Sequence, residues 1–155
     1  MPDQVPARLA DVLTLFGSVA SEEERAGLLL EYADQFHEVP PTISTRPFPE
    51  DHRVKFCESE AYVWVVQQSD GTLRPYFAVE NPSGVSARAL AVILQKTLSG
   101  STPEQIAGVP EDIVFQIFRR NISMGKGMGL LSMVQTVKAL ARRHAKETAP
   151  SPGDI

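Results

Sequence analysis

The segment Arg53-Val-Lys-Phe-Cys57-Glu-Ser-Glu-Ala-Tyr-Val-Trp64 joins a charged, irregular stretch to the most apolar strand-like run of the sequence. Residues 61–68 are rich in β-branched and aromatic side chains, which favour a pleated, buried surface. Cys57, the single cysteine of the chain, stands directly before this run. Because loops on a rigid scaffold often carry chemistry, Cys57 is a candidate nucleophile. A lone cysteine is more often a small buried hydrophobic residue, so both interpretations stay open.

Charged residues around Cys57 act in opposite directions on its thiolate, which is the reactive form of a thiol. Arg53 and Lys55 favour the thiolate through their positive charge, whereas Glu58 and Glu60 disfavour it. The sequence therefore does not decide how reactive the thiol is.

Helical periodicity precedes this segment. Apolar residues recur at helical spacing over residues 6–17, and Ser21 with Glu24 is typical of a capping box that starts a second helix. We expect Gly17 to end the first helix in a left-handed conformation. The four prolines within residues 37–51 predict an irregular connection, of a length that is typical of functional loops.

The apolar run is expected to form a hairpin with a second strand. Residues 69–71, Ser-Asp-Gly, are a turn signal. Residues 72–79 form the returning strand, in which Pro75 indicates an edge or a bulge. Because both faces of residues 61–68 are apolar, both faces of the sheet are predicted to be covered.

Helices are predicted again after the hairpin. Ser86 is expected to cap a mostly buried helix that ends near residue 98, because its apolar stripe is wide. Shorter helices are expected to begin at Pro103 and Pro110. Residues 121–129 are interpreted as a glycine-rich hinge into a last helix.

The order of these elements predicts an α+β fold. We expect a single domain in which a small antiparallel sheet of about three strands packs against helices from the N- and C-terminal parts of the chain. The domain is placed at residues 1–147, and residues 148–155 are expected to form a disordered tail.

The composition excludes several classes of protein. With 155 residues, 43% hydrophobic and 22% charged, the chain has the profile of one globular domain. Its net charge of −4 argues against nucleic-acid binding, which needs basic surface. We expect no membrane span, because no apolar run approaches the roughly 20 residues that a membrane helix needs. A single cysteine and the lack of a signal peptide predict a reducing, cytoplasmic location.

Residues 125–127, Gly-Lys-Gly, are similar to a phosphate-binding loop only in composition. A Walker loop requires glycine where Arg120 stands and serine or threonine where Gly127 stands. Lys126, with the free N–H groups of a helix start, could attract an anion or a thiolate. The glycines could equally serve only the entry into the helix.

The histidines do not form a recognisable site. His37, His52 and His144 have no metal-ligand spacing. A Cys57–His52 pair for nucleophilic catalysis is disfavoured, because alternate side chains of an extended segment point apart.

Residues 54–64 resemble the active-cysteine segment of the SufE family, the sulfur acceptors that work with cysteine desulfurases. In the family pattern a valine, two residues, a cysteine, a polar residue (often glutamine) and a serine precede an apolar strand. Val54, Cys57 and Ser59 match this pattern, with Glu58 at the usual glutamine position. The similarity extends over residues 8–143, and its other matching segments are the hairpin and residues 88–90, 101–106 and 122–133.

Two residues depart from the family pattern. Many members have glycine directly before the cysteine, where this chain has Phe56. Lys126 stands where the family commonly has arginine, which keeps the charge but loses the planar fork that clamps a carboxylate.

The resemblance implies a sulfur carrier. Cys57 would accept persulfide sulfur from a SufS-type cysteine desulfurase, stimulate that enzyme, and relay the sulfur to an iron–sulfur scaffold of the SufB type. Lys126, Arg88 and Lys55 would stabilise anionic sulfur or dock the partner. The chain itself would need no metal or cofactor, since pyridoxal phosphate would belong to the desulfurase. It would act as a sulfur-transfer partner rather than as a stand-alone enzyme.

Two other functions stay open at this point. A thiol-based redox enzyme or sensor would oxidise Cys57 to a sulfenic acid. A non-catalytic interaction module would not need the thiol at all.

Overall fold

The chain is built from six α-helices and one β-hairpin over residues 5–81 and 83–148, which the computed structural model describes. The expected tail therefore lies almost entirely outside the described residues, apart from Thr148 at the end of the last helix. The elements in chain order are α1 (Ala7–Gly17), α2 (Glu22–Ala33), β1 (Ala61–Gln67), β2 (Leu73–Val79), α3 (Val85–Leu98), α4 (Pro103–Ala107), α5 (Ile113–Phe118) and α6 (Met124–Thr148).

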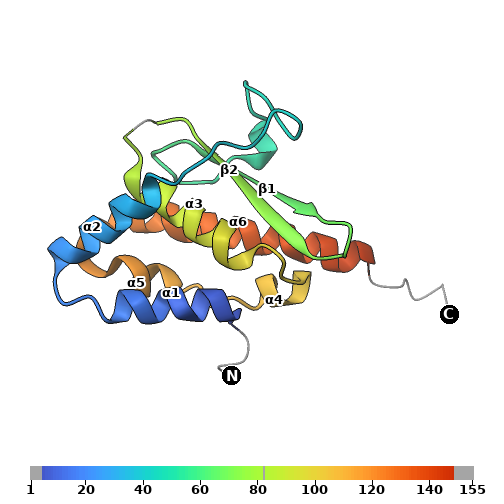
Figure 1. The fold of residues 1–155 in the computed structure, drawn as a ribbon. Helices are drawn as coiled ribbons and strands as arrows, with labels where there is room; N and C mark the ends of the chain where they lie inside the picture. The colour runs from blue at the N-terminus through green and yellow to red at the C-terminus, as the bar shows by residue number, and fades with distance from the viewer. Residues whose placement is uncertain (1–4, 82, 149–155) are drawn as a thin grey trace.

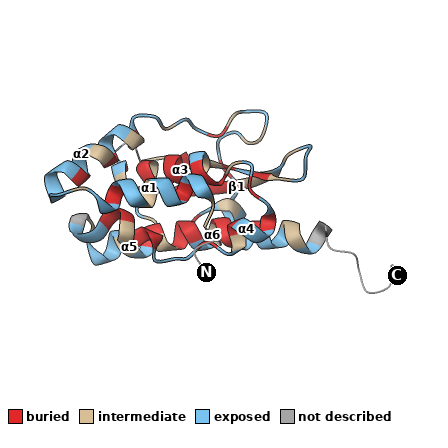
Figure 2. Cartoon of the chain, turned by 60° about the horizontal axis from the view of Figure 1, so that its bottom comes forward, coloured by how far each residue is buried: buried red, intermediate tan, exposed pale blue. Residues whose placement is uncertain are grey.

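The hairpin lies across α3 and α6; α1, α4 and α5 lie on the other side of this pair, and α2 packs beside α3 (Figure 1). β2 packs on α3 and β1 packs on α6, while α1 contacts both α3 and α5. Figure 2 shows that buried residues follow α3 and α6, whereas α1 and α2 expose their outer faces. The predicted α+β fold, with helices from both ends of the chain, is confirmed.

The sheet has two antiparallel strands over the described residues, where about three were expected. Its register places Ala61 opposite Val79 and Gln67 opposite Leu73. The segment before β1 contributes an isolated bridge between Arg53 and Tyr62 and one backbone hydrogen bond from the Val39 N–H to the Phe77 carbonyl, because its prolines interrupt regular pairing.

The hairpin turn forms as the sequence predicts. The Asp70 carboxylate accepts hydrogen bonds from the Thr72 N–H at 3.0 Å and the Thr72 hydroxyl at 2.6 Å. Gly71 supplies the positive φ of 86° that the turn needs. Pro75 lies on an edge strand, because β2 pairs only with β1 in the described part of the chain.

Both faces of the hairpin are covered, as predicted. One face joins the main core, and the proline-rich segment lies on the other. Phe48 from that segment packs against Tyr62 and Trp64, with ring centroids 5.2 Å and 5.4 Å apart. The long connection thus forms a second, smaller hydrophobic cluster above the sheet.

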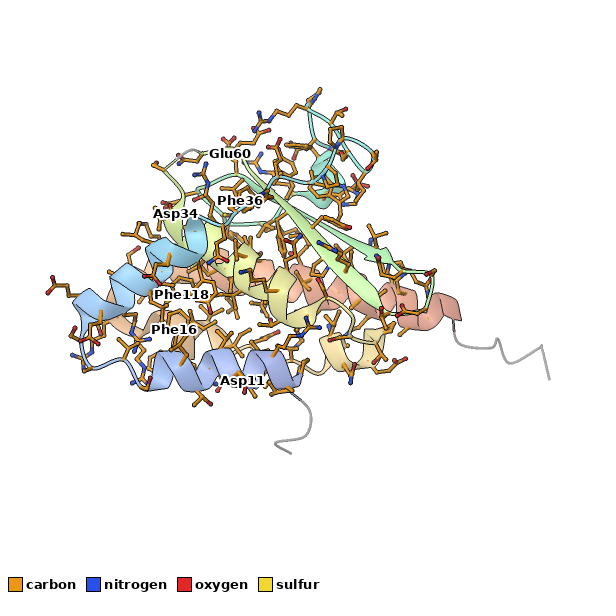
Figure 3. All side chains as sticks on the ribbon, viewed as in Figure 1. Asp11, Phe16, Asp34, Phe36, Glu60 and Phe118 are labelled. Carbon is orange, nitrogen blue, oxygen red and sulfur yellow. The ribbon has the colours of Figure 1, made fainter. Side chains whose placement is uncertain are left out.

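A buried arginine ties three helices together. Phe16 and Phe118 fill the interior between α1, α2 and α5 (Figure 3). Beside them Arg25 of α2, only 3% exposed, donates hydrogen bonds to the carbonyls of Ile117 at 2.8 Å and Phe16 at 3.0 Å. Carbonyls at helix C-termini lack partners within the helix, so this guanidinium stabilises the ends of α5 and α1 together.

Several predicted helix ends differ in detail. Ser21 accepts the Glu24 N–H as predicted, but the Glu24 carboxylate accepts from Ala20 N–H rather than closing the box on Ser21. Gly17 ends α1 without a left-handed conformation, since its φ is not positive.

The starts of the two long helices also differ from the prediction. α3 begins after Gly84, so Ser86 is not its cap. The glycines expected to form a hinge lie inside the first turns of α6, which starts at Met124. Within the described part of the chain, no helix is both long and apolar enough to cross a membrane.

Candidate functional site

Cys57 lies in a closed loop directly before β1, at the predicted junction. The Val54 N–H donates to the Ala61 carbonyl at 2.8 Å, which closes the base of the loop. Within it, the Glu60 N–H donates to the Cys57 carbonyl at 3.1 Å. The Ser59 carbonyl accepts the Asn81 N–H at 3.1 Å, which ties the loop to the segment after β2.

Two residues of this loop have left-handed backbone conformations. Phe56 has a φ of 60° and Glu60 a φ of 53°, a region that is costly for residues with a side chain and free of cost for glycine. The positive φ at position 56 favours glycine, which is the residue that the resemblance leads one to expect there. The chain keeps a strained phenylalanine next to Cys57.

Two glycines let helices approach the loop closely. A Cβ atom added to Gly129 of α6 would lie 2.8 Å from the Phe56 carbonyl oxygen and 3.0 Å from the Cys57 Cα. One added to Gly84 would lie 2.7 Å from the Ser59 Oγ. The glycine-rich segment is therefore not a hinge: Gly129 allows a helix to pack directly on the cysteine loop.

Cys57 lies between two hollows on the surface and is itself partly exposed. One is a pocket of about 280 Å³ between the loop, the start of α3 and the start of α6. The other is a more open groove of about 620 Å³ on the side of Arg53 and Lys55. Cys57 is therefore not sealed in the core, although its side chain also packs against the main hydrophobic cluster.

The structure brings three of the four predicted site residues together. Lys126 lines the pocket with Cys57, and Lys55 lines the groove. Among the described residues neither lysine has an ion-pair partner, although Glu58 lines both hollows. Arg88 lines neither hollow.

Arg88 faces another part of the molecule. Its guanidinium carbon lies 5.8 Å from the centroid of the Phe36 ring. Ser86 and Ala87, the residues just before it on α3, do line the pocket.

The histidines are used elsewhere. His52 shares a hydrogen bond of 2.8 Å through Nδ1 with the Val63 carbonyl, and its ring stacks on Trp64 at 5.2 Å. No histidine of the described chain lines either hollow. This geometry agrees with the expectation that His52 does not act as a base for Cys57. In the same residues no cluster of three or more histidine, cysteine or acidic side chains could hold a metal.

Sequence reasoning missed the segment after β2 as part of the site. Ser59, Asn81, Ser83 and Ser86 give the pocket a polar wall. The Asn81 Oδ1 accepts from the Ser83 N–H at 3.0 Å and the Ser83 hydroxyl at 2.7 Å, which shapes this turn. The sequence of residues 80–84, Glu-Asn-Pro-Ser-Gly, is typical of a turn, but nothing local indicates that this turn faces Cys57.

Exposed apolar side chains were also missed. Phe56 and Val85 line the pocket and are exposed. Met124 and Met128, four residues apart on the first turns of α6, are exposed as well. Only Phe56 and Val85 of these four line the pocket beside Cys57, and we call these two residues the apolar rim.

Comparison with known proteins places the chain in a family. Its fold is similar to the solution structure of a hypothetical protein from Thermus thermophilus, with a TM-score of 0.72 and 27% sequence identity, covering 92% of this chain and 98% of that chain. No curated protein matches the chain by sequence. The SufE model, described as an Fe-S metabolism associated domain, matches residues 10–141. The chain therefore belongs to the SufE family, whose domain is associated with iron–sulfur metabolism.

Proposed function

We propose that this protein accepts persulfide sulfur from a SufS-type cysteine desulfurase onto Cys57, stimulates that enzyme, and relays the sulfur to an iron–sulfur scaffold. The observation that carries the proposal is the placement of the single cysteine: partly exposed, between two hollows, in a loop clamped by α6. Family membership supplies the association with iron–sulfur metabolism.

The transfer needs only one thiol on this chain. The Cys57 thiolate attacks the outer sulfur of the donor's persulfide, and a new S–S bond forms at Cys57. The S–S bond of the donor breaks at the same time, and the donor cysteine leaves as a thiolate with the electron pair. The exchange is redox-neutral, so neither an oxidant nor a bound metal is required.

Lys126 and Lys55 are proposed to support the anionic sulfur from opposite sides. Lys126 lines the pocket and Lys55 the groove, and both ammonium groups lack ion-pair partners in the described part of the chain. Positive charge near a sulfur favours its thiolate or persulfide anion. We assign Arg88 no direct role at the sulfur, because it lies over Phe36 instead.

The lack of a second cysteine also protects the sulfur atom that is bound to Cys57. A second thiol in reach would attack the inner sulfur, form a disulfide and expel the bound sulfur as sulfide. The chain has one cysteine in all. A thiol peroxidase or redox sensor often relies on such a resolving cysteine, which this chain cannot supply by itself.

The test is the intact mass of the protein after incubation with a SufS-type desulfurase and cysteine. We expect wild-type protein to gain the mass of one or more sulfur atoms, and the gain to disappear on treatment with a reductant. Cys57→Ser should gain nothing and should no longer stimulate the desulfurase.

The circular dichroism spectrum and melting temperature of Cys57→Ser serve as the control, because this near-isosteric change at a partly exposed site should leave the fold intact. Stimulation that survives in Cys57→Ser, or a wild-type protein that acquires no sulfur, would refute the proposal.

A further inference from the structure

We infer that Phe56 is an anchor residue that inserts into an apolar recess of the sulfur donor, beside the donor's own reactive cysteine. The inference rests on the proposed function and adds to it the residue and the chemistry by which the partner is recognised. It concerns a side chain at which this sequence differs from the common family pattern.

The first observation is exposure. The Phe56 side chain is 70% exposed, although a phenylalanine is normally among the more buried residues. It borders both the pocket and the groove that flank Cys57. Covering an aromatic ring removes a large apolar surface from water, which stabilises the complex that covers it. Aromatic residues are accordingly enriched among the residues that dominate binding energy.

The second observation is independent of exposure. Phe56 has a φ of 60°, which is unfavourable for any residue with a Cβ and especially for a bulky one. Folding alone would be served better by glycine at this position, since glycine adopts this φ freely and exposes no apolar ring. Backbone strain of this kind persists mainly where it has a functional use.

The position of the ring identifies the partner. Phe56 precedes Cys57 and lines the same two hollows, so a macromolecule that brings a sulfur atom to the Cys57 thiol through either hollow is expected to contact the ring. Val85, the other member of the apolar rim, extends the apolar surface that such a partner would meet. The donor is therefore expected to present an apolar recess next to its persulfide, rather than a purely charged surface.

The experiment measures how much donor is needed to load Cys57. A fixed amount of this protein is mixed with cysteine and increasing concentrations of a SufS-type desulfurase, and the initial rate of persulfide formation on Cys57 is read by intact mass. We expect Phe56→Ala to raise the half-saturating desulfurase concentration roughly tenfold or more, the size of effect typical for an aromatic anchor. The rate at saturating desulfurase should change little.

A matched control comes from α5. Phe115 is 66% exposed, almost as much as Phe56, but it lines neither hollow beside Cys57. Phe115→Ala therefore removes the same exposed ring from another part of the surface, and it should leave the half-saturating concentration unchanged. Phe56→Trp, which keeps an aromatic ring, should retain most of the wild-type affinity.

Phe56→Gly separates anchoring from loop conformation. It removes the ring and also the strain, so its melting temperature should equal or exceed that of the wild type while its half-saturating concentration rises as in Phe56→Ala. If Phe56→Ala loads like Phe115→Ala, the anchor is refuted and the sulfur-acceptor function stands. If the wild type itself acquires no sulfur, the proposed function is refuted, and the anchor, which depends on it, is refuted as well.

Discussion

Replacing Gly129 by alanine tests whether α6 clamps the cysteine loop. The added Cβ would lie 2.8 Å from the Phe56 carbonyl oxygen and 3.0 Å from the Cys57 Cα, and both neighbours are backbone atoms that cannot rotate away. Glycine to alanine inside a helix normally stabilises by about 0.5–1 kcal/mol. Overpacking of a tight site costs about 1–3 kcal/mol. The clash is therefore expected to match or exceed the gain in helix propensity.

Gly127→Ala is the matched control, on the same helix two residues earlier. Its added Cβ would meet only the end of the Ile122 side chain, at 3.4 Å, which is an ordinary contact with a movable group. The propensity gain is common to both variants, so the difference in their stabilities isolates the clash. We expect Gly129→Ala to be less stable than Gly127→Ala by about 1–3 kcal/mol.

Urea unfolding measures this difference, and the rate at which iodoacetamide alkylates Cys57 reports the loop. A shifted loop should change the alkylation rate in Gly129→Ala but not in Gly127→Ala. If the two variants have equal stability and equal alkylation rates, α6 does not clamp the loop and the account of Gly129 is wrong.

Two further predictions concern the hairpin. Phe48→Ala should destabilise the protein by about 3–5 kcal/mol, the usual cost of removing a buried phenylalanine. It should also shift the fluorescence of Trp64, the single tryptophan, to longer wavelength, because Phe48 packs against that ring. A loss of stability below about 1 kcal/mol would show that the proline-rich segment does not hold the sheet. Burial, with a smaller contribution from the Glu80 carboxylate, raises the pKa of the Tyr62 phenol. The folded state thus favours the protonated phenol, so the contribution of Tyr62 to stability should be fully present below the unfolded tyrosine pKa of about 10 and be lost as the pH rises towards the folded value. Tyr62→Phe should flatten that alkaline decline in urea unfolding, and an unchanged slope would contradict the assignment.

Much of the fold follows from periodicity and turn chemistry alone. The apolar spacing that predicts a helix over residues 6–17 and the Ser-Asp-Gly turn of the hairpin report interactions within a few residues, and both are found in the structure. The two apolar faces of β1 correctly indicate that both sides are covered. The third strand is absent from the described residues because proline-rich residues 37–51 cover the sheet mainly with side chains, with one backbone hydrogen bond from the Val39 N–H to the Phe77 carbonyl at 2.8 Å.

The site was harder to predict from the sequence, because it forms where segments that are distant in the chain pack closely together. Glycine lowers helix propensity, so residues 125–129 favour a hinge when considered locally. Tertiary packing reverses that preference: α6 can press on the Cys57 loop only where Gly129 offers no side chain. The loop geometry at Phe56 was likewise invisible, since a phenylalanine gives no signal for a positive φ.

Backbone strain and backbone hydrogen bonds act against each other in the cysteine loop. Its two left-handed residues, Phe56 and Glu60, cost about 1–2 kcal/mol each. Four backbone hydrogen bonds close the loop and tie it to Glu80 and Asn81, and at about 0.5–1.5 kcal/mol each they match or exceed this strain. The close approach of α6 at Gly129 adds tertiary packing to these local bonds. In the proposed transfer Cys57 presents one sulfur atom first to a donor and then to an acceptor, and a loop fixed at its base, at the segment after β2 and at α6 keeps that atom in one place for both partners.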